Sequence, residues 1–254
     1  MRILLSNDDG IMAPGILAMY KALDGLGDID VVAPEGVQSG GSHAITIRHP
    51  VLWKSVRVGD CFTGTSVEGT PADCVKLAIN SLLPNRPDLV VSGINAGLNT
   101  GIHVLYSGTV AAAIEGAIFG CPAVAVSFEL YRDMDFAAAG RIARSIIDRI
   151  AADGFEPGTV YNINIPDLTD GPPRGIRVAP QSTQPMDERI ERRSDPYGRE
   201  YYWLTGDFKN IGDEADTDRH AISKGYVCVT PLHFNLTDGD LTKKMSGWKW
   251  PAVQ

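Results

Sequence analysis

The feature that most constrains the fold is a short apolar run at the start of the chain that ends abruptly in polar residues. The apolar residues 3–5 are followed by Ser-Asn-Asp-Asp-Gly at positions 6–10. Such a run, bounded by turn residues, is typical of a buried strand in a parallel sheet. In an open α/β sheet the ligand site lies just beyond the carboxyl ends of the strands. We therefore expect a first strand that carries two adjacent carboxylates, Asp8 and Asp9, to a functional edge.

Two interpretations of this carboxylate pair are open from the residues alone. Adjacent carboxylates repel each other unless a cation lies between them, which favours a metal site. The sequence Asn-Asp-Asp-Gly is also favourable for an ordinary turn stabilised by its own side chains. Further polar loops in the chain help to distinguish a metal site from an ordinary turn.

Strand-like apolar runs alternate with amphipathic stretches up to about residue 165. This alternation predicts an α/β fold with a mostly parallel sheet and right-handed crossovers. After the first strand, we expect further strands at 29–33, 89–91, 123–127 and 160–165, with a hairpin insertion at 51–63. Helices are expected to begin at Pro14, Thr70 and Ser107, and another to cover 136–150.

The pattern changes after about residue 180. Residues 181–225 are rich in charge, tyrosine and glycine. After residue 180, the segments 201–204 and 226–230 resemble strands, and we expect both to be isolated. A stretch of this length is uncommon as a plain loop in a compact domain. Its aromatic side chains are of the kind that interfaces favour. We therefore expect one domain over 1–254, with 181–225 as a protruding arm that contacts a second subunit.

Two further loops place polar groups at the expected strand ends. The loop Ser39-Gly-Gly-Ser42 follows the second strand, and Asn95 and Asn99 follow the strand at 89–91. Together with the two aspartates, these loops offer hydroxyl, amide and carboxylate oxygens, which suit Mg²⁺, Mn²⁺ or Ca²⁺ better than zinc. Three polar, glycine-rich strand ends favour a metal site over coincidence.

The sequence Tyr-Ser-Gly-Thr-Val-Ala-Ala at 106–112 predicts a helix start that can bind an anion. If Ser107 is the N-cap, the amides of Gly108, Thr109 and Val110 lie free at the beginning of the helix. The hydroxyls of Ser107 and Thr109 add donors. An ordinary serine cap is the alternative, but the adjoining glycine-rich loop favours phosphate binding.

Composition excludes several classes of partner. The formal net charge of −8 argues against binding to a nucleic-acid duplex or an anionic membrane, and no stretch is long and apolar enough to span a bilayer. The four cysteines are scattered without a Cys-x-x-Cys spacing, which predicts reduced thiols in a cytoplasmic protein.

Several motifs of the chain resemble those of a known family. The motifs Ile-Leu-Leu-Ser-Asn-Asp-Asp-Gly at 3–10, Gly-Thr-Pro-Ala-Asp-Cys-Val at 69–75, Pro-Asp-Leu-Val-Val-Ser-Gly-Ile-Asn-Ala-Gly at 87–97 and Tyr-Ser-Gly-Thr-Val-Ala-Ala at 106–112 are similar to those of the SurE family, the stationary-phase survival proteins and 5′/3′-nucleotidases. The resemblance covers essentially the whole chain. It implies a Rossmann-like three-layer α/β domain with a protruding C-terminal arm used in oligomerisation, here in a homodimer or homotetramer.

The resemblance also implies an activity and a site. The activity is metal-dependent hydrolysis of nucleoside 5′- and 3′-monophosphates, with Mg²⁺ or Mn²⁺ as the cofactor. One divalent ion per subunit would be held by Asp8, Asp9, Ser39 and Asn95, with the two aspartates also catalytic. The phosphate would lie near four further residues, which are Asn99, Ser107, Gly108 and Thr109. His43 and His103 lie in the same loops and are candidates for substrate contacts.

Two other functions remain open. An aspartyl-phosphate enzyme would use a carboxylate as nucleophile, although such phosphatases carry Asp-x-Asp after the first strand and here the aspartates are adjacent. A nucleotide-binding regulator would keep the site without turnover. Trapping of an acyl-phosphate separates the first from simple hydrolysis, and phosphate release from AMP separates the second.

Overall fold

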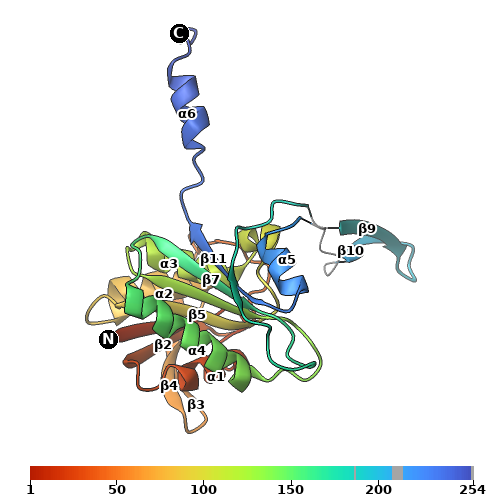
Figure 1. The fold of residues 1–254 in the computed structure, drawn as a ribbon. Helices are drawn as coiled ribbons and strands as arrows, with labels where there is room; N and C mark the ends of the chain where they lie inside the picture. Colours follow the sequence, from red (N-terminus) through yellow and green to blue (C-terminus); the bar gives the residue numbers. More distant parts are fainter. Residues whose placement is uncertain (186, 208–213, 253–254) are drawn as a thin grey trace.

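A nine-stranded sheet organises the described part of the chain, which comprises residues 1–185, 187–207 and 214–252 of this computed structural model (Figure 1). From one edge to the other its strands are β3 (Leu52–Val58), β4 (Phe62–Glu68), β2 (Asp28–Pro34), β1 (Arg2–Ser6), β5 (Leu89–Ala96), β6 (Ala123–Phe128), β7 (Thr159–Ile165), β11 (Val227–His233) and β8 (Ile176–Val178). The six strands from β4 to β7 run parallel, whereas β3, β11 and β8 oppose them.

The strand order reverses beside β1. The chain proceeds from β1 outward to β2 and β4 on one side, and then returns to β5 on the other side. A crevice opens at the carboxyl ends of the strands at such a switch point, and ligands of open α/β sheets bind there. Ser6, the last residue of β1, pairs with Ser92, so the last residues of β5 extend beyond the end of β1 at this position.

Helices cover both faces of the sheet and give the predicted three layers (Figure 1). The first layer consists of α1 (Pro14–Ala22) and α4 (Phe136–Asp153), and the second of α2 (Pro71–Leu77) and α3 (Gly108–Ile118). A short π-helix, Ala78–Leu82, follows α2, and a 3₁₀ helix, Gly101–Leu105, precedes α3.

Side-chain alternation along β1 divides the core between the two helix layers. Ile3 and Leu5 pack on the α1 and α4 side, whereas Leu4 packs on the α2 and α3 side. All three are fully buried. The same alternation puts Ser6, the last residue of β1, on the face of Leu4, and Asp8 contacts Thr109 of α3 on that side of the sheet. The polar residues that follow β1 are thereby directed to the side of the sheet where α3 begins.

The helix starts follow from local sequence. Pro14 occupies the first turn of α1, where its missing N–H costs nothing. The Thr70 hydroxyl accepts a hydrogen bond from the Asp73 amide at 3.1 Å, and the Asp73 carboxylate accepts one from the Thr70 amide at 2.9 Å. This reciprocal capping box fixes the start of α2.

Two sequence expectations about isolated strands were wrong. Residues 226–230 fall largely within β11, which pairs with β7 because Val227 and Val229 alternate into the main core. Residues 201–204 fall in β10 (Glu200–Asp207), which pairs along its length with β9 (Asp187–Ser194). β9 was missed because its sequence, Asp-Glu-Arg-Ile-Glu-Arg-Arg-Ser, has no apolar alternation.

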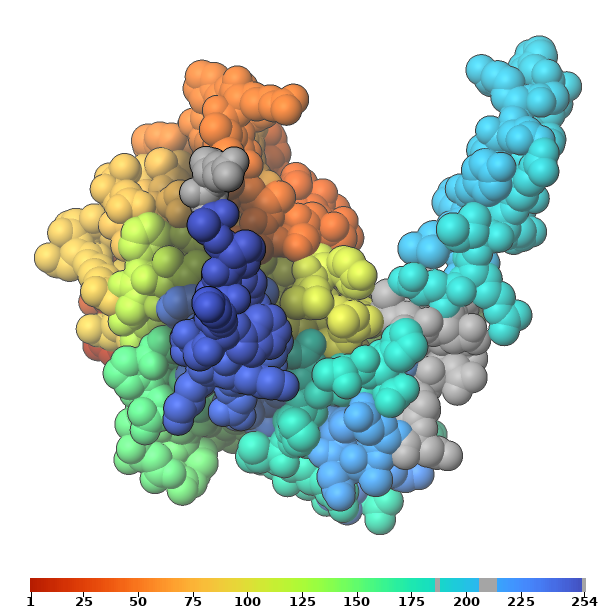
Figure 2. All heavy atoms as spheres, turned by 90° about the horizontal axis from the view of Figure 1, so that it is seen from above, coloured from red at the N-terminus to blue at the C-terminus, as the bar shows by residue number. Residues whose placement is uncertain are grey.

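The hairpin β9–β10 extends away from the body of the molecule, as Figures 1 and 2 both show. Part of the expected arm behaves differently, because α5 (Asp218–Ser223) packs on β11 through Ala221 and Ile222. A second extension leads from β11 to α6 (Gly239–Ser246), which buries no residue (Figure 1). Within the described ranges, no helix has the length and apolar character needed to cross a membrane.

Candidate active site

The predicted carboxylate pair lies at the switch point, with its two members in different surroundings. Asp8 is 4% exposed and accepts a hydrogen bond from the Thr109 hydroxyl at the start of α3. Asp9 is half-buried and accepts one from the Ala96 amide at 3.1 Å, at the end of β5. The pair therefore joins β1 to both α3 and β5.

The electrostatics of Asp8 favour a cation. Burial raises its pKa to about 6; hydrogen bonding from Thr109 opposes the rise and the charge of Asp9 adds to it. Within the part of the chain that the structure describes, no lysine or arginine forms an ion pair with either aspartate. A positive charge brought to this position would relieve both effects.

Asn95 precedes Ala96 at the end of β5, and the Ala96 amide donates to Asp9. Its Nδ2 donates to the carbonyl of Gly97 at 2.8 Å, which leaves Oδ1 as an oxygen that can bind a cation. β5 extends to Ala96, beyond the predicted end at residue 91, and its register with β6 shifts between Ser92 and Asn95.

Ser39 lies in a loop that is anchored beside Asp8. The amide of Gln38 donates to the main-chain carbonyl of Asp8 at 2.7 Å, so Ser39 follows a residue that is hydrogen-bonded to the main chain of Asp8. Ser39 itself is exposed. Further along the same loop, the Ser42 amide donates to the carbonyl of Tyr106 at 3.0 Å. The loop is thus hydrogen-bonded both to the segment that follows β1 and to the residue before the α3 N-cap.

The start of α3 differs in detail from the sequence expectation. Ser107 is the N-cap, but its hydroxyl accepts from the Val110 amide at 3.1 Å, so that amide is not free for an anion. The Thr109 hydroxyl is committed to Asp8. A Cβ at Gly108 would lie 2.8 Å from the Cβ of Asp8, so a side chain there would collide with the carboxylate residue. The helix start and Asp8 therefore form one packed unit.

Asn99 is the centre of a buried polar network that sequence reasoning did not anticipate. Its Nδ2 donates to the Ser127 hydroxyl at 2.8 Å, and its amide donates to Oδ1 of Asn164 at 2.8 Å. Its carbonyl accepts from the side chains of Asn162 and Asn164 at 2.8 and 3.2 Å. The signal was present as two asparagines at alternating positions in an otherwise apolar strand, which places both on one face.

The two histidines of the site loops have separate surroundings. Nε2 of His43 lies 2.7 Å from the buried carboxylate of Glu115 on α3, and Lys76 on α2 lies 2.5 Å from the same carboxylate. His103 is half-buried in the 3₁₀ helix, and its pKa is lowered by burial and by the charge of Arg219. His43 is thus the better positioned of the two to fix a site loop on α3.

The donor set fits a hard divalent cation better than zinc. Across the described residues, no group of three or more histidine, cysteine, aspartate or glutamate side chains is placed to hold a metal. What the edge offers is the carboxylates of Asp8 and Asp9, with the oxygens of Ser39 and Asn95 in the adjoining segments. Oxygen-only sets with few protein ligands are the kind that Mg²⁺ and Mn²⁺ use.

The fold and the site together define a three-layer α/β protein with a pair of carboxylates at its topological switch point and a capped helix start beside them. Comparison with known proteins gives the family. Residues 3–188 match the family model described as Survival protein SurE. The chain belongs to the SurE family, as its motifs predicted.

Relatives match over nearly the entire chain. The 5′-nucleotidase SurE of Rhodopirellula baltica is 47% identical over 249 residues, covering 98% of both chains. That of Syntrophobacter fumaroxidans is 43% identical, covering 98% of this chain and 99% of its own. The crystal structure of the SurE protein from Aquifex aeolicus superposes with a TM-score of 0.84 at 38% identity, covering 97% of this chain and 98% of that one. The expected α/β fold is confirmed.

Proposed function

We propose that this chain is a nucleotidase that hydrolyses nucleoside 5′-monophosphates to nucleoside and phosphate. The observation that carries the proposal is the buried Asp8 carboxylate, which lies beside Asp9 and is hydrogen-bonded to the start of α3 at the sheet switch point. Relatives that match nearly the whole chain carry the name 5′-nucleotidase SurE, which supports the same activity. We also propose that the chain hydrolyses nucleoside 3′-monophosphates.

The proposed cofactor is one divalent cation per subunit, Mg²⁺ or Mn²⁺. Asp8, Asp9, Ser39 and Asn95 would hold it, in keeping with the oxygen donors at this edge. When bound, such a cation supplies positive charge that offsets the charge developing on the phosphoryl oxygens and makes a nearby water a better nucleophile.

The chain's own residues perform the remaining tasks. The start of α3, with Ser107, Gly108 and Thr109, would place partial positive charge near the phosphate, and Asn99 would contact it from the neighbouring loop. Thr109 also holds Asp8 in place through its hydroxyl. One of the two aspartates would accept the proton of the attacking water as the bond from phosphorus to the ribose oxygen breaks.

A phosphate-release assay tests the proposal. Purified protein is incubated with AMP in the presence of MnCl₂, MgCl₂ or EDTA, and inorganic phosphate is measured. We expect release with the cations and none with EDTA. No release under any condition would support the alternative of a nucleotide-binding regulator. Hydroxylamine trapping of an acyl-phosphate during turnover would instead support the aspartyl-phosphate alternative.

We further propose a cytoplasmic homodimer or homotetramer in which residues 181–225 contact a second subunit. Support for the assembly comes from the protruding β9–β10 hairpin, on which Tyr202, Trp203 and Leu204 are each more than half exposed. Support for the compartment comes from the four cysteines, which are all free thiols.

A further inference from the structure

A fully buried carboxylate that the proposed mechanism does not use belongs to Asp218, in the first turn of α5. Its oxygens accept hydrogen bonds from three main-chain amides. Oδ2 accepts from Gly101 at 2.7 Å, and Oδ1 accepts from Ser182 at 2.9 Å and from Arg219 at 2.7 Å. Burial raises the pKa of this carboxyl, and the three amides and the charge of Arg219 oppose the rise. Asp218 therefore joins three separate segments of the chain.

One of these segments, the loop that ends at Gly101, is held at that residue from both sides. The Gly101 amide donates to Asp218, and the Gly101 carbonyl accepts from Nε2 of Gln181 at 2.8 Å. The backbone there is left-handed, with a φ of 54°, and a Cβ would lie 2.8 Å from Cδ of Arg219. Glycine at this position lets the loop approach α5 closely enough for both hydrogen bonds.

The same loop also has an apolar contact with α5. Leu98 packs against a small buried cluster to which α5 contributes Ala221 and Ile222. The helix therefore supports the loop at residue 98 and again at residue 101, on either side of Asn99. This support adds to the contacts of Asn99 itself with β6 and β7.

The position of the Asn99 main chain matters because its side chain has one donor to spare. Nδ2 carries two hydrogens, and one of them is donated to the Ser127 hydroxyl at 2.8 Å. The second hydrogen is available for a phosphate oxygen. Its direction depends on where the loop holds residue 99, and small displacements of a positioning group are costly in catalysis.

We propose that Asp218 and Gln181 are positioning residues for the phosphate site, because they hold Gly101 from both sides and so fix the loop that presents Asn99. This inference rests on the proposed nucleotidase function. Gln181 precedes β9 and Asp218 follows β10, and the Ser182 amide joins the two segments through Asp218. The root of the protruding hairpin thus supports the site.

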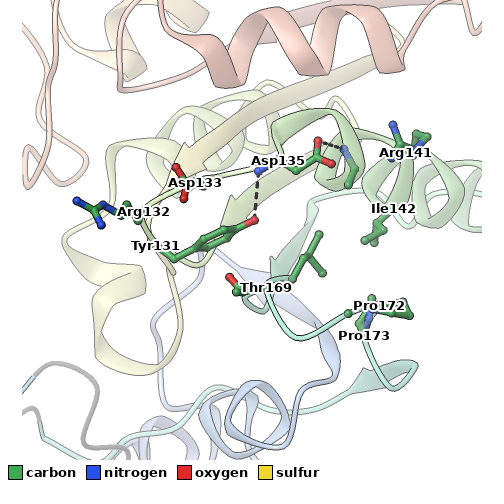
Figure 3. A pocket seen from close by; sticks show the side chains of 12 residues that line it. Tyr131, Arg132, Asp133, Asp135, Arg141, Ile142, Thr169, Pro172 and Pro173 are labelled. Carbon is green, nitrogen blue, oxygen red and sulfur yellow. Dashed lines mark hydrogen bonds between the residues drawn. The ribbon is translucent and has the colours of Figure 1, made fainter.

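A hollow of about 600 Å³ beside α4, which we call the α4 hollow, supplies a matched control. It lies between the start of α4 and the loop after β7, and Tyr131, Asp133 and Asp135 are among its lining residues (Figure 3). Asp135 accepts a hydrogen bond from the Ala138 amide at 2.9 Å at the start of α4. Like Asp218, it is a carboxylate bonded to main-chain amide at a helix start. None of the residues assigned to cation or phosphate lines this hollow.

The test separates phosphate binding from cation binding. Inorganic phosphate and, separately, MnCl₂ are titrated calorimetrically into the wild-type protein, Asp218→Asn, Gln181→Met and the control Asp135→Asn. We expect Asp218→Asn to weaken phosphate binding and to lower kcat/KM for AMP about tenfold, because its amide presents a donor where the loop needs an acceptor. Gln181→Met loses one neutral hydrogen bond and should weaken both about threefold. The Kd for Mn²⁺ should stay within about twofold, and Asp135→Asn should change nothing.

A double-mutant cycle tests whether Asp218 acts through Asn99. In an Asn99→Ala background, Asp218→Asn should lower kcat/KM by less than about twofold more, because the contact that it positions is already absent. A further tenfold loss would overturn the inference, as would unchanged phosphate binding in Asp218→Asn or an equal loss of phosphate and Mn²⁺ binding. If Asp218→Asn does not fold, Gln181→Met and its cycle with Asn99→Ala decide the question by the same criteria.

Failure of the nucleotidase proposal is distinguishable from these outcomes. It would appear as the absence of phosphate release from AMP by the wild-type protein. In that case the calorimetric titration of inorganic phosphate still reports on the loop. Phosphate binding that is weakened by Asp218→Asn and not by Asp135→Asn would support the positioning role, and equal or absent binding would overturn it.

Discussion

At the scale of single residues, Asp8 and Asp9 carry the largest expected effects on activity. Asp8→Asn and Asp9→Asn each remove a charge from the end of the first strand without changing side-chain size. We expect phosphate release from AMP to fall by at least about a hundredfold in each, the scale of losing a principal electrostatic stabiliser. Asp133→Asn, an exposed residue of the α4 hollow, is the matched control. Near-normal turnover in both site variants, with unchanged circular dichroism, would contradict the assignment.

Thr109 tests whether the helix start acts through Asp8. Its hydroxyl donates to the Asp8 carboxylate, so Thr109→Val removes a hydrogen bond to a charged group while keeping the side-chain shape. We expect kcat and kcat/KM to fall together by about tenfold or more. Thr109→Ser keeps the donor and should recover most of the loss. Equal activity in the valine and serine variants would show that the hydroxyl has no role in turnover.

At the scale of elements, Glu115 links α3 to α2 and to the site loop. Burial opposes its ionisation, but hydrogen bonds from His43 and Lys76 outweigh burial and hold its pKa below the ordinary value of 4.5. Because the pKa is lower in the folded state, the unfolded chain binds more protons at acidic pH. The resulting stability is fully present above about pH 4.5 and is lost as the pH falls through the folded-state pKa.

Glu115→Gln should therefore change the pH dependence of stability. At pH 7 we expect the free energy of unfolding in urea to fall by about 1–2 kcal/mol, because hydrogen bonds to a charge are lost while both partners stay partly in water. Below about pH 4.5 the wild-type protein should lose stability more steeply than the variant. Parallel curves for the two proteins across this range would show that Glu115 does not titrate as described.

The hairpin β9–β10 is the element expected to join subunits. Replacing 188–206 with a short glycine–serine linker removes the protruding part and leaves α5, which packs on β11, in place. We expect the mass measured by light scattering to fall by at least one subunit. If the variant keeps the parent subunit count, another element, such as the extension that carries α6, makes the interface.

At the scale of the whole molecule, cation binding should appear as added stability. A ligand that binds only the folded state contributes about 2.7 kcal/mol at one hundred times its Kd. For a chain of this size we expect MnCl₂ to raise the Tm by roughly 5–10 °C relative to EDTA in scanning calorimetry. Asp9→Asn should lose most of this rise. A rise of equal size in Asp9→Asn would place the cation elsewhere.

The hairpin and β11 show where local sequence fails to report the environment of a strand. β9 contains a single apolar residue, Ile190, and its partner β10 supplies the pairing that makes it a strand. Neither apolar alternation nor turn chemistry signals such an element, because its stability comes from main-chain hydrogen bonds to a segment several residues away. β11 was recognisable as a strand, but its place against β7 depends on packing of the whole sheet.

What the sequence alone determined is the alternating α/β order, the caps of α2 and α3, and the polar edge that carries Asp8, Asp9, Asn95 and Ser107. These follow from local rules, because the spacing of apolar residues, the capping residues and the residues at strand ends each depend on a few neighbouring positions. Only the tertiary structure decided that Thr109 is committed to Asp8, that Asn162 and Asn164 support Asn99, and that Glu115 holds His43. Each of these contacts joins residues more than sixty positions apart, and their partners are chosen by how the sheet and helices pack.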